Sequence, residues 1–357
     1  MQIVNPFSTI YISSDIPLFL SKIINDIKPS KLFVLVDENT KIHCLPILKK
    51  GDLINNAEII EISSGELNKS IQSVQKAWEV LSNSGAERNS LLINLGGGVV
   101  VDLGGFIAST FKRGIPFINI PTTLLSQVDA SVGGKTGFNF LQLKNEIGTF
   151  SHPNAVIINS IFLKTLDKDA IYSGWAEMIK HALIYSKADW ENIKSHRLES
   201  LDYESLNKLI ARSIQIKVHF AEQDPLEKGI RKALNFGHTF GHAFESLFMG
   251  TPNEISHGKA VAHGMICELY LSNKKCGFDE KEINNIAEYL GRLFGKLMIS
   301  SKDFDKIIQL IRHDKKNENS IFNFTLLSDF GNVLINSPCT DNEIMDALNW
   351  YQKTLTT

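Results

Sequence analysis

Short apolar runs alternate with a helical pattern through the first half of the 357-residue chain, and this alternation constrains the fold most. Between the second and third runs, residues 70–83 repeat apolar side chains at helical spacing, and Gly85 follows as a stop signal. Strands interleaved with helices predict βαβ units and a parallel sheet. The five β-prone runs lie at residues 32–36, 59–62, 91–95, 117–120 and 156–158.

The second half of the chain has a different pattern. From about residue 167, apolar residues recur every three or four positions, which predicts helices. A single late strand pair is expected near 322–327 and 333–335. We therefore expect two domains, an α/β domain over residues 1–165 and a mostly α-helical domain over residues 166–357. The predicted helices cover 171–184, 198–220, 233–248, 260–271 and 283–297.

Charge and composition exclude several classes of protein. Thirty-seven Lys and Arg residues face 39 Asp and Glu residues, a net charge of −2, which argues against a dedicated nucleic-acid or membrane-surface binder. The balanced net charge does not exclude a local basic pocket that binds a small anion. No apolar run approaches the roughly 20 residues of a membrane span, and the N-terminus lacks a signal-peptide pattern. The four cysteines form no CxxC pair, so we expect buried thiols in a soluble cytoplasmic protein.

Three consecutive glycines, residues 96–98, directly follow the run at 91–95 in LLINLGGGVVVDLGGF. Glycine lets the backbone approach a phosphate, and the N-terminus of the next helix supplies N–H donors. Asp37 and Asn39 end an earlier strand, where a sheet crevice binds ribose and base. Although the spacing is not GxGxxG, the order of elements favours a Rossmann-like nucleotide-binding domain. The alternative is a tight turn that only packs the helix closely.

A second glycine loop, DASVGGKTG at residues 129–137, carries Lys135. A Walker A loop is excluded, because Asp129 stands where that motif needs glycine. Lys144, Arg113 and nearby threonines suggest a small anionic ligand. The alternative is a solvated loop.

A carboxylate and three histidines have the spacing of a metal site. Arg231, Asn235, His238 and His242 recur along one face of a predicted helix that otherwise reads as buried, and His257 follows. Earlier in the chain, Glu177 and Lys180 are three residues apart and share a helix face. One carboxylate with two histidines is a frequent catalytic zinc set. Because three histidines are available for two ligand positions, the choice of ligands is open at this point.

Two further basic positions are ambiguous. Lys217 lies on the preceding predicted helix, where it enters the same site or faces solvent. Lys315 and Lys316 lie in the charged run DKKN, for which a solvated turn is the default interpretation.

Together these motifs resemble the 3-dehydroquinate synthase family. The resemblance runs from about residue 32 to 335 and rests on GGGVVVD, RGIPFINIPTTLLSQVDASVGGKTG, KNEIGTF, GWAEMIK, RKALNFGHTFGHAFE, HGKAVAHG and DKKN. It implies an NAD- and divalent-metal-dependent lyase of the shikimate pathway, with zinc or cobalt as the metal. Such an enzyme converts 3-deoxy-D-arabino-heptulosonate 7-phosphate into 3-dehydroquinate and phosphate. It also implies a homodimer, with a nucleotide-binding α/β domain followed by a helical metal domain.

The resemblance also implies residue roles. Glu177, His238 and His257 would hold the metal, with His242 on the substrate side. Substrate and phosphate contacts would come from Lys135, Asn145, Lys180, Lys217, Arg231, Asn235, Arg113 and one of Lys315 and Lys316. NAD would be lined by Asp37, Asn39, Glu66, Lys69, Gly98, Val99, Val100, Val101, Asp102, Thr122, Thr123, Asp129, Lys144, Phe162, Leu163, Lys164 and Thr165.

Three alternatives share this two-domain plan. A sister sugar-phosphate cyclase would alter the pocket positions at Lys180, Lys217 or Asn235, which here keep the residue types of 3-dehydroquinate synthase. A glycerol-type metal-dependent dehydrogenase would release NADH and would not need Lys135, the Lys144–Asn145 pair and Lys180 together. A non-catalytic homologue would have lost a metal ligand or Lys180, and all are present.

Overall fold

The computed structural model describes residues 1–141, 143–312 and 322–354, so Lys315 and Lys316 lie outside the described residues. The chain forms two compact units. Unit 1 contains residues 1–174 and 201–218, and unit 2 contains residues 175–200 and 219–357. The predicted domain division after residue 165 stays a prediction, because compactness alone does not define an independent domain.

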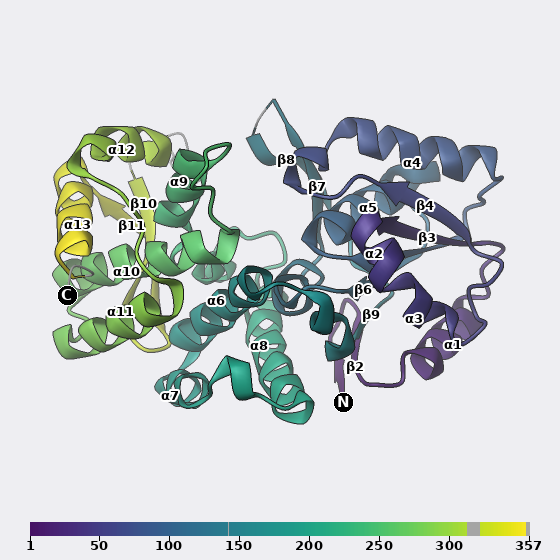
Figure 1. Cartoon of the computed structure of the whole chain (residues 1–357), viewed down its shortest axis with the longest axis horizontal. Helices are drawn as coiled ribbons and strands as arrows, with labels where there is room; N and C mark the ends of the chain where they lie inside the picture. The colour runs from purple at the N-terminus through teal and green to yellow at the C-terminus, as the bar shows by residue number, and fades with distance from the viewer. Residues whose placement is uncertain (142, 313–321, 355–357) are drawn as a thin grey trace. The chain divides into compact units, whose positions relative to one another are not determined.

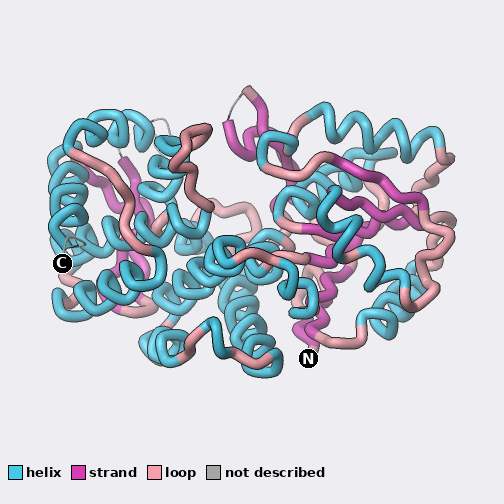
Figure 2. The backbone as a smooth tube through the Cα atoms, viewed as in Figure 1, coloured by secondary structure: helices cyan, strands magenta, loops and turns pink. Residues whose placement is uncertain are grey.

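A seven-stranded sheet forms the centre of unit 1 (Figures 1 and 2). All its pairs are parallel except the first, which is antiparallel. All five strands predicted from the sequence are confirmed, whereas the two N-terminal strands were not predicted. In spatial order the strands are β1 (Gln2–Val4), β2 (Thr9–Ile12), β9 (Ala155–Ile158), β6 (Phe117–Pro121), β5 (Leu91–Gly96), β3 (Leu32–Asp37) and β4 (Glu58–Ile62).

Helices cover both faces of this sheet because its strands are apolar on both sides. In β3, Val34 and Val36 pack with the helices of one face, and Phe33 and Leu35 pack with those of the other. A parallel sheet covered on both faces needs such continuous apolar runs. The first face carries α1 (Ile16–Ile27), α2 (Glu38–His43) and α3 (Leu45–Lys49), and the second carries α4 (Ile71–Asn83) and α5 (Gly98–Thr110).

The second glycine loop leads into a β-hairpin that was not predicted. Its strands are β7 (Lys135–Phe140) and β8 (Leu143–Phe150), which pair antiparallel. A pair of hydroxyl groups joins the hairpin to α5, because Thr149 Oγ1 lies 2.8 Å from Ser109 Oγ. Within the hairpin, Thr149 Oγ1 lies 2.7 Å from Thr136 Oγ1 of β7. Short helical turns complete unit 1: η1 (Glu66–Asn68), η2 (Phe111–Arg113), η3 (Ser126–Ala130) and η4 (Ser160–Thr165).

Unit 2 is helical around one hairpin (Figure 1). Helices α6 (Lys168–Tyr185) and α8 (Tyr203–Gln223) continue from one unit into the other along the chain. The late strand pair is confirmed as β10 (Phe322–Asp329) with β11 (Asn332–Cys339). The remaining elements are α7 (Lys187–Ser195), η5 (Leu198–Ser200), η6 (Ile230–Asn235), α9 (His238–Phe248), α10 (His257–Cys276), α11 (Glu280–Phe294), η7 (Ser301–Asp303), α12 (Phe304–Arg312) and α13 (Asp341–Thr354).

Helix α10 forms the core of unit 2. It contacts α9, α11, α13 and β10, and it buries every residue from Ala260 to Leu269. A helix that is buried all round needs apolar or small residues on every side, and its sequence AVAHGMICEL meets that condition at most positions. The two exceptions, His263 and Glu268, are fully buried polar residues.

One predicted helix is wrong. The continuous helix expected over 233–248 is interrupted: the 3₁₀ helix η6 ends at Asn235, and α9 begins at His238. Gly237 lies between them with φ +82°, a conformation that glycine adopts readily and that ends a right-handed helix. The polar stripe from Arg231 to His242 therefore does not lie on one helix.

No helix in the described ranges is long and apolar enough to cross a membrane. All four cysteines are free thiols; Cys44, Cys267 and Cys339 are buried as expected, whereas Cys276 is partly exposed.

Candidate functional site

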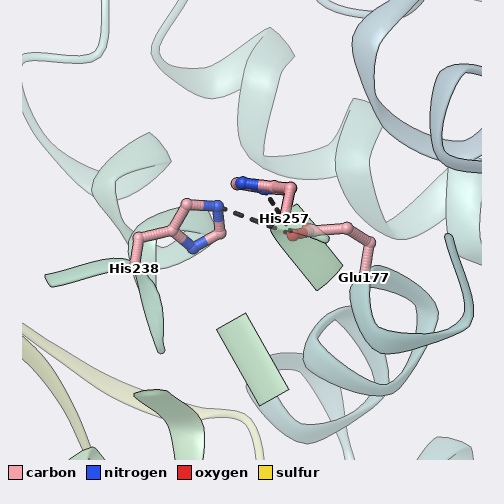
Figure 3. Close-up of side chains that lie close together, drawn as sticks. All are labelled: Glu177, His238 and His257. Atoms are coloured by element: carbon pink, nitrogen blue, oxygen red, sulfur yellow. Dashed lines mark ion pairs between the residues drawn. The ribbon is translucent and has the colours of Figure 1, made fainter. Parts of the chain in front are cut away.

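Three side chains of unit 2 converge on one point (Figure 3). Glu177 comes from α6, His238 is the first residue of α9, and His257 is the first residue of α10. Their candidate ligand atoms lie within 4.8 Å of one another. The Nε2 atoms of His238 and His257 lie 3.6 Å and 3.5 Å from Glu177 Oε1.

Each histidine turns its other ring nitrogen toward an acceptor. His238 Nδ1 lies 3.2 Å from the carbonyl oxygen of Phe236, and His257 Nδ1 lies 3.3 Å from Glu245 Oε2. Such outer partners select the tautomer that presents Nε2 to a metal. One carboxylate oxygen and two imidazole nitrogens suit zinc and similar divalent ions and leave a coordination position for substrate. These residues therefore fit a divalent cation.

The charges around His257 also fit a site for a divalent cation. Burial by itself would lower the pKa of His257, but its interactions with the Glu177 and Glu245 carboxylates outweigh burial and raise the pKa to about 10. Two carboxylates thus favour a positive charge at this ring. A cation bound at Nε2 would take the place of that proton, so metal binding would release a proton.

His242 and Lys180 border the triad. The His242 ring centroid lies 5.4 Å from that of His238 and 6.2 Å from that of His257, and His242 is not part of the group that converges on Glu177. This geometry favours His238 and His257 as the ligand pair. The ammonium group of Lys180 donates a hydrogen bond to Glu177 Oε2, and both side chains are buried, as the three-residue spacing predicts.

Backbone and side-chain acceptors hold Arg231 and Asn235 of η6. The Arg231 guanidinium donates to the carbonyl oxygen of Pro225 at 2.8 Å, and its backbone N–H donates to Asp224 Oδ2 at 3.2 Å. The Asn235 amide donates to Glu227 Oε1 at 2.7 Å. Lys180 and Arg231 are buried and Asn235 is partly buried, and all three belong to unit 2.

In unit 1, the glycine turn brings α5 tightly against its neighbours. A Cβ on Gly96 would lie 2.4 Å from the Cβ of Val100, and one on Gly104 would lie 1.9 Å from Asn94 Oδ1. Helix α5 begins after Gly97, a residue with no side chain to cap it. Its first N–H groups can therefore face an anion. These features fit a nucleotide diphosphate at Gly98, Val99, Val100 and Val101.

Asp102 follows on the same helix and binds Lys69. Lys69 Nζ lies 2.6 Å from Asp102 Oδ2 and also donates to Asn145 Oδ1 on the hairpin. Burial raises the pKa of the Asp102 carboxyl, and the Lys69 ammonium opposes that rise. The structure therefore brings together Lys69, Asp102 and Asn145 across 76 positions of sequence.

Lys217 lies beside Asp129 rather than in solvent. Its Nζ lies 2.6 Å from the Asp129 carbonyl oxygen and 2.5 Å from Asp129 Oδ1. Lys217 is buried, and both residues belong to unit 1.

The other residues predicted to contact NAD or phosphate make separate local contacts or are exposed. Asp37 caps α2 through Thr40, Glu66 accepts from Asn139 at 2.8 Å, and Lys164 lies over the ring of Tyr203. Thr122, Phe162 and Leu163 are buried, and Thr123 is partly buried. Exposed or partly exposed positions are Asn39, Arg113, Lys135, Lys144 and Thr165.

Three carboxylates at the site were missed by sequence reasoning. Glu245 supports His257, Glu227 orients Asn235, and Glu268 binds the first turn of α9. Only Glu268 carried a signal in the sequence, because it interrupts the apolar run of a buried helix. Glu227 and Glu245 lie in polar or amphipathic surroundings where a glutamate is unremarkable.

Comparisons with known proteins agree with this arrangement. The family model for the N-terminal part of 3-dehydroquinate synthase matches residues 59–173, and the model for its C-terminal part matches residues 174–317. The 3-dehydroquinate synthase of Parabacteroides distasonis is 46% identical over 344 residues, which cover 96% of this chain and 98% of that protein. That of Clostridium tetani is 38% identical over 325 residues, covering 89% and 85% of the two chains.

Solved structures share the fold. A 2-deoxy-scyllo-inosose synthase complexed with carbaglucose-6-phosphate, NAD⁺ and Co²⁺ superposes with a TM-score of 0.86 at 22% identity, covering 98% of this chain and 99% of that one. A 2-epi-5-epi-valiolone synthase from Streptomyces hygroscopicus with NAD⁺ and Zn²⁺ bound has a TM-score of 0.80 at 22% identity, with 98% of both chains covered. At such identities the likeness concerns the fold. The two family models and the near full-length identity carry the conclusion that the chain belongs to the 3-dehydroquinate synthase family.

Proposed function

We propose that this chain converts 3-deoxy-D-arabino-heptulosonate 7-phosphate into 3-dehydroquinate and phosphate, with NAD reduced and reoxidised within one turnover. The observation that carries the proposal is the convergence of Glu177, His238 and His257, with Lys180 bonded to the same glutamate. Relatives named for this activity include one that is 46% identical over 96% of this chain. The chain works as a cytoplasmic homodimer on this sugar phosphate.

Glu177, His238 and His257 hold the divalent cation, zinc or cobalt. When bound, it polarises a substrate hydroxyl oxygen and stabilises negative charge there. His257 is oriented by Glu245, and His238 by the Phe236 carbonyl, so both rings are positioned before substrate arrives.

The cationic side chains recognise the carboxylate and phosphate groups of the substrate. Lys180 and Arg231 belong to unit 2, and Lys135 and Lys217 to unit 1, with Arg113 and one of Lys315 and Lys316 completing this set. Buried cations stabilise the charge that develops on a departing phosphate. Asn235, oriented by Glu227, and His242 hydrogen-bond substrate hydroxyls.

NAD binds to unit 1. The N-terminus of α5 receives its diphosphate, and Asp102 and Lys69 form one connected group beside it. Bound NAD would supply the hydride acceptor and donor for a transient oxidation of the substrate, so no NADH would accumulate. Asp37 and Glu66 serve the adenosine end.

The decisive experiment measures phosphate release from the heptulosonate phosphate with catalytic NAD. We expect phosphate and 3-dehydroquinate in equal amounts, with no net rise in absorbance from NADH. Net NADH formation would instead indicate a dehydrogenase, and turnover of sedoheptulose 7-phosphate in place of the heptulosonate would indicate a sister cyclase.

A second experiment tests the metal. Chelation should abolish phosphate release, and added Zn²⁺ or Co²⁺ should restore it. His257→Ala should lower bound metal, whereas His196→Ala should not, because the His196 ring lies at the end of helix α7, where Nδ1 is 2.7 Å from the Asn192 carbonyl oxygen and 3.3 Å from Ser195 Oγ. Full activity after complete chelation would contradict the metal role.

A further inference from the structure

Glu268 is a fully buried carboxylate in the middle of α10 that the proposed reaction does not use. Its oxygens accept hydrogen bonds from the first turn of α9. Oε2 lies 2.7 Å from the Gly237 nitrogen, and Oε1 lies 3.1 Å and 3.4 Å from the nitrogens of Thr239 and Phe240. A buried carboxylate is stable only when such donors surround it.

Helix α9 depends on this carboxylate because it has no cap of its own. Helices usually begin with Ser, Thr, Asp or Asn, whose side chain accepts from the first turn. Here Gly237 occupies that position, with φ +82° and no side chain. Glu268 therefore supplies from a neighbouring helix both the acceptor and the negative charge that favour a helix N-terminus.

The two helices touch closely enough to make this contact. A Cβ on Gly264, one turn before Glu268, would lie 2.0 Å from the Gly237 carbonyl oxygen. The absence of a side chain at Gly264 thus places the first turn of α9 directly on α10. Glu268 then lies beneath that turn.

The residue held between these hydrogen bonds is His238. Glu268 binds the backbone N–H groups on both sides of it, at Gly237 and Thr239. The same helix α10 begins with His257, the second histidine of the triad. One helix therefore carries one ligand directly and anchors the backbone of the other.

We propose that Glu268 is a positioning residue that sets the distance between His238 and His257 by capping α9 from α10. The inference rests on the proposed metal site, but it concerns metal affinity and geometry rather than turnover. Truncation or neutralisation of Glu268 frees the first turn of α9, so His238 loses its defined place beside Glu177. Outer residues of this kind typically change metal affinity about 10- to 100-fold.

The test compares Glu268→Gln with the unaltered full-length chain. A glutamine keeps the size of the side chain but turns an NH₂ group toward backbone N–H donors. At a temperature where both proteins are folded, Co²⁺ affinity is measured by competition with a chelating dye, and the visible spectrum of the Co²⁺-loaded site is recorded. We expect about 10- to 100-fold weaker binding and a changed spectrum.

Ser272→Ala is the matched control. Ser272 lies one turn further along α10 and is equally buried. Its hydroxyl donates to the Glu268 backbone carbonyl at 2.7 Å and accepts from the Leu327 nitrogen at 3.0 Å, so these hydrogen bonds reach α10 and β10 rather than α9 or the Glu268 carboxylate. This variant should lose stability yet keep the Co²⁺ affinity and spectrum. If Glu268→Gln binds Co²⁺ with unchanged affinity and spectrum, or if Ser272→Ala loses affinity equally, the positioning role is refuted.

If Glu268→Gln does not fold, Glu268→Asp replaces it. The aspartate keeps the charge but is one methylene group shorter, so Co²⁺ binding about 10-fold weaker is expected, and unchanged binding overturns the inference. Failure of the proposed function is a separate result. A chain that binds Co²⁺ but releases no phosphate refutes the reaction and leaves the role of Glu268 standing.

Discussion

The contact between α9 and α10 predicts that Gly264→Ala is severely damaging although it adds a single methyl group. A Cβ at this position would lie 2.0 Å from the Gly237 carbonyl oxygen and 2.7 Å from the Gly241 nitrogen. Ordinary contact begins at 3.4 Å. Both opposing atoms are backbone, so no side chain can rotate away, and the helices must separate by about 1.4 Å.

Two opposing effects set the change in the free energy of unfolding that Gly264→Ala causes. Alanine in a helix interior is favoured over glycine by about 1 kcal/mol. Overpacking a close-packed interior typically costs about 1–3 kcal/mol. A clash with backbone atoms, which cannot rotate away, is expected at or above the upper end of that range. We expect a net loss of roughly 2 kcal/mol in the free energy of unfolding. We also expect at least about tenfold weaker metal binding, since ligand distances tolerate only about 0.2 Å.

Gly241→Ala is the graded control on the same interface. Its Cβ would lie 3.1 Å from the Cα of Val261, so a shift of a few tenths of an ångström suffices. Its free energy of unfolding should stay within about 1 kcal/mol of the unaltered chain, because the gain in helix propensity offsets the contact. Urea denaturation and Co²⁺ titration measure both variants. Equal stability and equal metal affinity of Gly264→Ala and the unaltered chain would refute the reasoning.

Three further predictions follow from other contacts. Glu245→Ala should weaken metal binding about 10- to 100-fold by calorimetric titration, because His257 loses its outer acceptor; affinity equal to that of the unaltered chain would exclude this role. Lys69→Met should lower the free energy of unfolding by about 3 kcal/mol, because Asp102 is left as an uncompensated, largely buried carboxylate. The added Asp102→Asn change should restore part of that loss in urea denaturation, and strict additivity of the two changes would contradict the pairing. Burial alone would raise the pKa of Asp224, but backbone N–H donors hold its pKa below the usual value. Its stabilising contribution is therefore present above the unfolded pKa of about 3.9 and is lost as pH falls through the folded pKa. Asp224→Asn should destabilise the chain at pH 7, and the difference should shrink below about pH 4 in urea denaturation; a constant difference across pH would disagree.

Local sequence patterns predicted most of the sheet because strand formation here depends on continuous apolar runs. The runs at 32–36 and 91–95 became β3 and β5 because both faces of a parallel sheet are covered. The segment 70–83 became α4, with Ser70 as its cap. The short strands β1 and β2 were missed because each includes a polar residue within its three or four positions, whereas the equally short β9 is continuously apolar.

The candidate site, like the sheet, was predicted from the sequence only in part. The spacing of Glu177 and Lys180 predicted their contact, since residues three apart share a helix face. The stripe from Arg231 to His242 was wrongly placed on one helix, because apolar spacing does not reveal that Gly237 adopts a positive φ. That break makes His238 the first residue of α9.

By itself, the sequence determined the chemistry available to this protein: a glycine turn after a strand, a carboxylate and histidines of metal-binding type, and lysine and arginine residues near them in the sequence. The tertiary structure decided which of these groups meet. It favours His238 with His257 over His242, joins Lys69 to Asp102 and Asn145, and brings Glu245 and Glu268 to the metal triad. The physical reason is the distance along the chain over which each effect acts. Propensity and periodicity act over a few residues, whereas the carboxylate that caps α9 reaches it only because Gly264 lets two helices touch.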